Sequence, residues 1–154
     1  MDQVEHVSIV IEEDEVFDEL SLLLVGHGFA VDRYECLKES EAVRPAALLL
    51  LGVSPSRFAS TGWPQSLRDQ PVIVVSDASG MLPPFETLSK VADFVDVLRR
   101  PFEPEEVLAR VNAALLWRRE RLTLGRACSE LQELRLLNQE SADDLAEQRM
   151  ARCL

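Results

Sequence analysis

Apolar residues recur in five short runs along the N-terminal two thirds of the chain, and each run has the length of a β-strand. The runs cover residues 6–11, 29–34, 46–51, 72–75 and 93–98. The third and fourth runs are continuously apolar. Such strands are typical of a parallel sheet that is covered on both faces, because neither face of the strand is left to water.

The segments between these runs carry helix signals. Asp14 can cap a helix whose apolar positions follow at helical spacing, and Gly26 and Gly28 end that helix. Shorter helices are expected at residues 38–43, 65–68 and 85–91.

The alternation of strands and helices predicts parallel pairing through right-handed crossovers. The expected fold class is therefore α/β, with a doubly wound, five-stranded parallel sheet. In open sheets of this kind, functional sites form beyond the carboxyl ends of the strands. The loops that can carry a site are residues 12–15, 51–56, 76–80 and 99–103.

A long helix is predicted at the C-terminus. Pro104 stands at its first position, acidic residues fill the first turn, and the rest of the chain contains no proline and one glycine, Gly125. Beyond about Trp117 we expect this helix to extend past the domain on which its first turns pack. We therefore expect an α/β domain at 1–118 and a helical, coiled-coil extension at 119–154.

The extension carries a heptad pattern. With Leu124 at an a position, five of the eight a and d positions are apolar. The a positions hold Leu124, Leu131, Asn138 and Leu145, and the d positions hold Ala127, Leu134, Ser141 and Gln148. A single Asn at an a position favours a parallel dimer in fixed register, so the expected partner is a second copy of this chain. Antiparallel packing of the helix on its own domain or on a partner domain is the alternative.

The charge of the chain narrows the range of partners. The formal net charge is −11, with 27 Asp and Glu residues against 16 Lys and Arg residues. Nucleic acids and anionic membranes attract basic surfaces, so we expect the protein to bind neither. The segment 117–126 is locally basic, and in an acidic chain such a patch more often pairs with acidic protein surface.

The cysteines and the apolar runs bear on location. Cys36, Cys128 and Cys153 are an odd number of thiols without metal-binding spacing, which favours reduced thiols. No apolar run approaches the ~20 residues that span a bilayer, and the N-terminus lacks the basic segment of a signal peptide. A cytoplasmic location is therefore expected.

Four segments at the ends of the predicted strands carry a family resemblance: IVIEEDEVF (9–17), RPAALLLLG (44–52), PVIVVSD (71–77) and DVLRRPFEPEEVLARV (96–111). Together they resemble the receiver domain of bacterial two-component response regulators, the CheY-like superfamily, over about residues 6–118. The resemblance implies the strand order 2-1-3-4-5. It also assigns the acidic pair of the family to Glu12 and Glu13, its Ser/Thr switch position to Ser76 and its lysine to Arg100.

The chain departs from that family at the position that carries its chemistry. The phosphoacceptor aspartate of the family falls on Leu51, or on Gly52 if the alignment shifts by one residue. Neither side chain can accept a phosphoryl group, because the acceptor must be a carboxylate beside Mg²⁺. The aromatic switch position falls on Val97, which has no ring. The resemblance therefore implies a pseudo-receiver, with a receiver scaffold, no catalytic residue and no cofactor.

The remaining positions of this vestigial pocket allow more than one interpretation. Glu12 and Glu13 are weak candidates for a divalent ion site, and no metal is expected. The same acidic residues can instead form a solvated loop, or one of them can pair with Arg100. Ser76 is either a turn residue or a switch residue, and by resemblance the peptide bond between Arg100 and Pro101 is cis.

The expected function is a phosphorylation-independent signalling or protein-interaction module that is not an enzyme. It would dimerise through the C-terminal helix and dock signalling or scaffold proteins, or regulate a downstream output domain. The alternative is a true phosphoacceptor with a displaced carboxylate, Asp14 or Asp77. A flavodoxin-like enzyme is disfavoured, because no glycine-rich phosphate loop follows the first strand.

Overall fold

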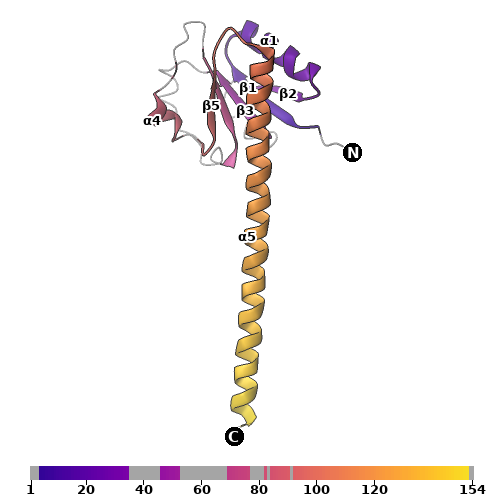
Figure 1. Ribbon diagram of the computed structural model, residues 1–154, viewed down its shortest axis with the longest axis vertical. Coiled ribbons are helices and arrows are strands. Elements are labelled where there is room, and N and C mark those ends of the chain that lie inside the picture. The colour runs from indigo at the N-terminus through magenta and orange to yellow at the C-terminus, as the bar shows by residue number, and fades with distance from the viewer. Residues whose placement is uncertain are drawn as a thin grey trace. The chain divides into compact units, whose positions relative to one another are not determined.

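The computed structural model describes residues 4–34, 46–52, 69–76, 82, 84–90 and 92–152 (Figure 1). The chain divides into two compact units, Met1–Arg118 and Arg119–Leu154. The short helices expected at 38–43 and 65–68, and the carboxylate of Asp77, lie outside the described residues.

The first unit contains one five-stranded sheet in the order β2-β1-β3-β4-β5, with parallel pairing throughout. Its strands are β1 (His6–Ile11), β2 (Ala30–Tyr34), β3 (Leu48–Gly52), β4 (Val72–Val75) and β5 (Val95–Leu98). The described helices are α1 (Asp14–Gly26), α4 (Phe85–Leu88) and α5 (Pro104–Arg152). The predicted fold class and strand order are confirmed. The helix expected at 85–91 ends at Leu88 and is four residues long.

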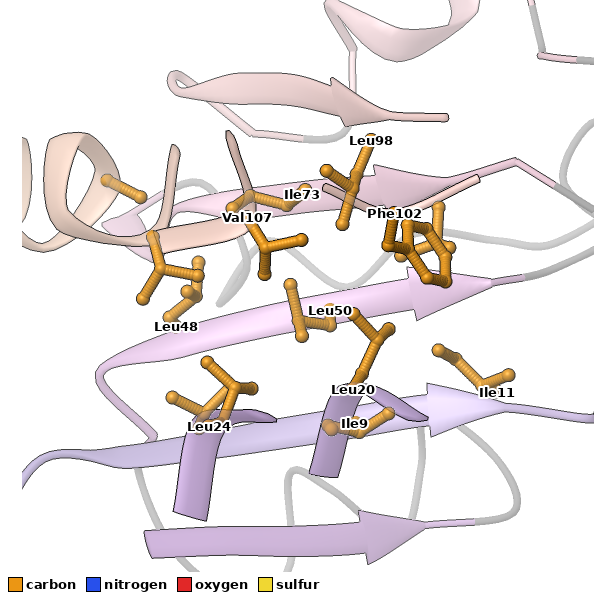
Figure 2. Close-up of a cluster of buried hydrophobic side chains, with 14 of the residues drawn as sticks. Ile9, Ile11, Leu20, Leu24, Leu48, Leu50, Ile73, Leu98, Phe102 and Val107 are labelled. Atoms are coloured by element: carbon orange, nitrogen blue, oxygen red, sulfur yellow. The ribbon is translucent and has the colours of Figure 1, made fainter. Parts of the chain in front are cut away.

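One face of the sheet packs against α1 and the first turns of α5. Figure 2 shows Leu48 and Leu50 of β3 lying among Leu20 and Leu24 of α1, with Val107 of α5 nearby. Each of these leucines and Val107 is completely buried. This face forms the larger core, and removing five apolar side chains of this size from water contributes roughly 7–15 kcal/mol through burial, at about 1.5–3 kcal/mol each.

The opposite face of the sheet forms a second core. The alternate leucines of β3, Leu49 and Leu51, point to this face and pack with Val74 of β4 and Leu88 of α4. The four leucines of β3 are at most 1% exposed. Successive side chains of a strand alternate between faces, so this run of leucines serves two cores at once.

The ends of α1 differ in part from the expectation. Glu13, rather than Asp14, occupies the N-cap position, and its side chain makes no capping hydrogen bond. Asp14 is the first helical residue, and its Oδ1 accepts a hydrogen bond of 2.6 Å from Arg33 of β2. The carboxylate of Asp14, which was expected to cap the helix, thus pairs with Arg33 instead. At the other end, Gly28 adopts φ +88, a backbone conformation that favours glycine.

The second unit consists of the continuation of α5. All of its described residues, 119–152, are helical and exposed. Six leucines between Leu122 and Leu137, with Leu145, are 48–67% exposed. Exposed hydrocarbon side chains on a helix are a surface that burial against another apolar surface would stabilise.

Candidate functional site

The candidate site lies at the carboxyl edge of the sheet, where parallel strands end side by side. Glu12 and Glu13 follow β1, Gly52 ends β3, Ser76 follows β4, and Arg100 lies two residues beyond β5. The pairing of β3 with its neighbours sets Leu51 beside Val10 on one side and Val74 on the other. The topology therefore brings together the predicted pocket residues.

Leu51 occupies the core rather than an open pocket. Its side chain is completely buried in the smaller core, with Val10 and Val74 beside it. A carboxylate in this setting would lose its hydration without gaining a partner, which is costly for a charged group. The site thus presents a hydrocarbon at the position that the resemblance assigns to the phosphoacceptor.

Gly52, the other possible phosphoacceptor position, leaves no room for a side chain. It pairs with Ile11 across the sheet, and a Cβ atom at position 52 would lie 2.9 Å from Cγ1 of Ile11. Ile11 is itself buried in the larger core. A side chain at position 52 therefore requires Ile11 or the strand to move.

Arg100 forms ion pairs with acidic side chains at this edge of the sheet. Its guanidinium lies 3.6 Å from the carboxylate of Glu13 and 3.9 Å from that of Glu19 on α1. The expected pairing of Arg100 with one acid of the pair is thus confirmed for Glu13. Glu12 is exposed and engaged in an interaction of its own. The Arg100 pairs are partly exposed, so each contributes at most about 1 kcal/mol.

Ser76 joins the ends of two strands. It is 2% exposed, and its backbone N–H donates to the carbonyl of Leu98 at 2.9 Å. Its hydroxyl accepts a hydrogen bond of 3.3 Å from the backbone N–H of Arg100. The Arg100–Pro101 peptide bond is cis, as expected. Ser76 therefore ties the end of β4 to the turn that carries Arg100.

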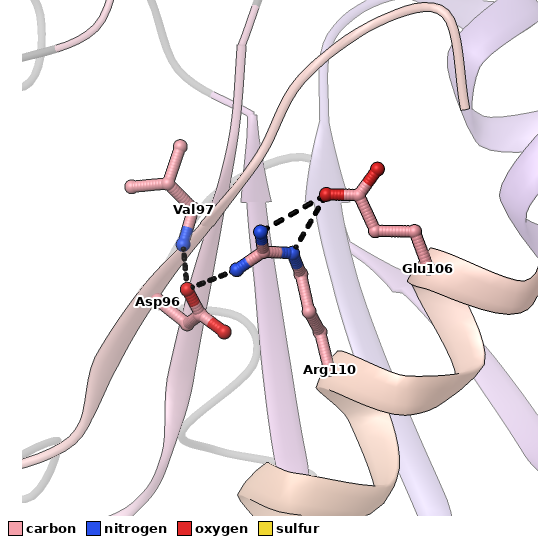
Figure 3. A network of polar contacts seen from close by, with 4 residues as sticks. All are labelled: Asp96, Val97, Glu106 and Arg110. Carbon is pink, nitrogen blue, oxygen red and sulfur yellow. Dashed lines mark hydrogen bonds and ion pairs between the residues drawn. The ribbon is translucent and has the colours of Figure 1, made fainter. Parts of the chain in front are cut away.

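A network that the sequence analysis missed lies between β5 and α5 (Figure 3). Nη1 of Arg110 lies 2.6 Å from Oδ1 of Asp96, and Nε donates to Glu106 at 3.0 Å. The same Oδ1 accepts from the backbone N–H of Val97 at 2.8 Å. The hydrogen bonds to Asp96 and then Glu106 raise the pKa of Arg110. The network fastens the first turns of α5 to the sheet.

The spacing of Glu106 and Arg110, four residues apart on one helix, is a signal that could have predicted half of this network. Nothing in the sequence indicates that Asp96, inside a strand, points to the same guanidinium. Glu19 was missed for a similar reason, because its approach to Arg100 depends on how α1 crosses the sheet.

The described residues contain no group of three or more His, Cys, Asp or Glu side chains able to hold a metal ion. Mg²⁺ prefers oxygen ligands. Among the residues predicted to form the pocket, Glu12 and Glu13 carry carboxylates that could act as such ligands. Within the same ranges, no helix combines the length and apolar character needed to cross a membrane.

No protein-family model and no curated protein matches the sequence. Solved structures do match it. NtrX from Brucella abortus, in complex with ADP, is 14% identical with a TM-score of 0.65, over 80% of this chain and 29% of that one. The chain thus spans less than a third of that NtrX structure.

Two further structures extend the comparison. A CheY-like receiver domain protein from Methanospirillum hungatei JF-1 is 17% identical with a TM-score of 0.59, over 77% of this chain and 99% of that one. A trimeric coiled-coil segment of yeast Spc42 fused to another structure is 14% identical with a TM-score of 0.62, over 90% of this chain and 97% of that one. The sheet order and these likenesses show that the chain has the fold of response regulator receiver domains.

Proposed function

We propose that this protein is a phosphorylation-independent signalling module of two-component type. It would dimerise through its C-terminal helix and dock or regulate a signalling partner, a scaffold protein or a downstream output domain. It would carry out no catalysis and need no cofactor. Its acidic charge and reduced thiols favour protein partners in the cytoplasm over nucleic acids or membranes.

The observation that carries the proposal is the complete burial of Leu51 between Val10 and Val74. Phosphoryl transfer needs a carboxylate whose charge a divalent cation neutralises. Here the corresponding strand end contributes to the core, and Gly52 beside it abuts Ile11.

The pairing of Arg100 supports the same interpretation. The guanidinium of Arg100 is already paired with the carboxylates of Glu13 and Glu19 within the chain. Asp14, one of the two displaced carboxylates considered as phosphoacceptors, is already bonded to Arg33 at 2.6 Å.

The exposed leucines of α5 support the dimerisation half of the proposal. Leu124, Leu131 and Leu134 fall in one heptad seam, and each is more than half exposed. A second copy of the helix would bury this seam and recover roughly 25 cal/mol for each Å² of apolar surface removed from water.

Light scattering on the full chain tests the dimerisation half and whether a phosphoryl mimic changes the assembly. We expect the molar mass of a dimer, unchanged when Mg²⁺ and beryllofluoride, a phosphoryl mimic, are added. A monomer would remove the dimerisation half. A change of mass on adding beryllofluoride would contradict phosphorylation independence. A receiver domain with an intact phosphoacceptor, treated in parallel, is the control for the reagent.

A further inference from the structure

The residues that flank the heptad seam of α5 separate by charge. With Leu124 at position a, the charged residues at g positions are all acidic, and those at e positions are all basic. The acidic g residues are Glu130 and Asp144, and the basic e residues are Arg121, Arg135 and Arg149. All five lie in the exposed stretch of the helix. One edge of the seam is therefore negative and the other positive.

We propose that this separation makes the second copy bind parallel and in register, in a two-stranded coiled coil. The inference rests on the proposed dimerisation. In a parallel pair, a g residue faces the e residue five positions further along the partner. Glu130 then meets the partner's Arg135, and Asp144 meets the partner's Arg149. Two-fold symmetry repeats each contact, so four opposite-charge pairs flank the seam.

The antiparallel arrangement has the opposite result. There the g edge of one helix faces the g edge of the other, and the e edges also face each other. Glu130 and Asp144 would confront acids, and Arg135 and Arg149 would confront arginines. Like charges at such positions repel, so the same residues that favour one orientation oppose the other.

The helix itself offers no acid to the two arginines. Side chains three or four residues apart are neighbours on a helix. The residues at these spacings from Arg135 are Leu131, Gln132, Asn138 and Gln139, and none is acidic. Those from Arg149 are Leu145, Ala146, Arg152 and Cys153. In the proposed dimer, the second copy therefore supplies the acids that Arg135 and Arg149 lack at these spacings on their own helix.

Asn138 adds an independent constraint on register. It is the polar a position of this seam, and it lies between the two proposed pairs along the helix. In a parallel, in-register dimer the a positions of the two helices share a layer, so the two Asn138 side chains can hydrogen-bond to each other. A slip by one heptad would bury each of them against a leucine.

Charge reversal in the full chain tests the proposal. Glu130→Arg/Asp144→Arg and Arg135→Glu/Arg149→Glu should each raise the dimer dissociation constant about tenfold or more, from the summed loss of exposed ion pairs. The variant with all four substitutions should return to the original value. In an antiparallel dimer, all three variants would keep like charges facing each other and show no such pattern, which would overturn the proposal.

A matched control separates this effect from net charge. Glu133→Arg/Glu147→Arg changes the net charge as much as Glu130→Arg/Asp144→Arg, at c positions away from the seam. We expect its dissociation constant to stay within about twofold of the original. Equal weakening by both variants would contradict a role for specific pairs.

A cross-link reads the orientation directly. In a chain with Cys36→Ser, Cys128→Ser and Cys153→Ser, the substitution Ala127→Cys puts one thiol at a d position. A parallel, in-register dimer should oxidise to a covalent dimer. A dimer by light scattering that fails to cross-link would overturn the orientation and leave the proposed dimerisation standing. A monomer would overturn both, and a trimer would overturn the two-stranded arrangement.

Discussion

Leucine runs dominate two regions of this protein, with opposite consequences. In β3 the four leucines at 48–51 are at most 1% exposed, because a strand covered on both faces buries every side chain. In the second unit the leucines of α5 between 122 and 145 are 48–67% exposed in the part of the chain that the structure describes. Leucine thus fills the core beside the candidate site in one region and forms an exposed apolar surface in the other.

The core leucines should show the largest effect on folding. Leu50→Ala removes a fully buried side chain from the larger core and should lower the free energy of unfolding by about 2–5 kcal/mol. Leu136→Ala, at an exposed f position of the extension, should change it by less than about 0.5 kcal/mol. Urea denaturation of the two variants measures the difference. Similar losses for both would erase the contrast between the regions.

The seam leucines should matter to association rather than to folding. Leu131 and Leu136 are 58% and 62% exposed, but only Leu131 lies in the proposed seam. Leu131→Asp should raise the dimer dissociation constant about a hundredfold or more, because two leucines leave the seam and two charges enter it. Leu136→Asp should leave it nearly unchanged.

Sedimentation equilibrium at several protein concentrations measures both constants. If Leu136→Asp weakened the dimer as much as Leu131→Asp, the heptad frame would be wrong.

The substitution Gly52→Ala tests how closely the end of β3 packs against Ile11. The added methyl group would lie within 3 Å of Ile11, as the 2.9 Å separation shows, so the variant should lose about 1–3 kcal/mol of stability through overpacking. Gly125→Ala is a suitable contrast, since nothing lies within 4 Å of a Cβ there. Gly125→Ala should stabilise the helix by about 0.8–1 kcal/mol. Thermal unfolding compares them, and a stable Gly52→Ala would refute the close packing.

The polar network should have the smallest effect. Arg110→Gln removes the charge pairs to Asp96 and Glu106, which are partly exposed, so we expect a loss of about 0.5–1 kcal/mol. The pKa of Arg110 is raised in the folded state, so its contribution is complete below the ordinary arginine pKa and is lost only as pH rises through the raised value.

Urea titrations at pH 7 and pH 9 check this sign. The loss caused by Arg110→Gln should be the same at both values. A loss that disappears at pH 9 would contradict a fully charged Arg110.

The sequence predicted the sheet well because apolar runs report burial directly. The alternation of strands and helices then left few possible topologies. The strands β3 and β4 could be predicted from their uninterrupted runs of apolar residues alone. The pairing of Arg100 with Glu13 followed from two strand ends meeting at one edge.

The remaining features depend on geometry that a linear pattern does not contain. The approach of Glu19 to Arg100 and of Asp96 to Arg110 depends on helix placement across the sheet. The capture of Asp14 by Arg33 shows a long-range pair displacing a local preference, since Asp14 was expected to cap α1. The pattern of apolar residues at 85–91 predicted a longer helix than α4, whose four residues include Leu88 of the smaller core.

The central claim is that Leu51 closes the strand end to phosphoryl chemistry, so that signals pass through contacts between protein surfaces. Intact-mass spectrometry of the full chain after incubation with Mg²⁺ and acetyl phosphate tests it most directly. We predict an unchanged mass, while a receiver with an intact phosphoacceptor gains one phosphoryl group under the same conditions. A stable phosphoryl adduct on this chain, mapped to Asp14, Asp77 or another carboxylate, would contradict the account.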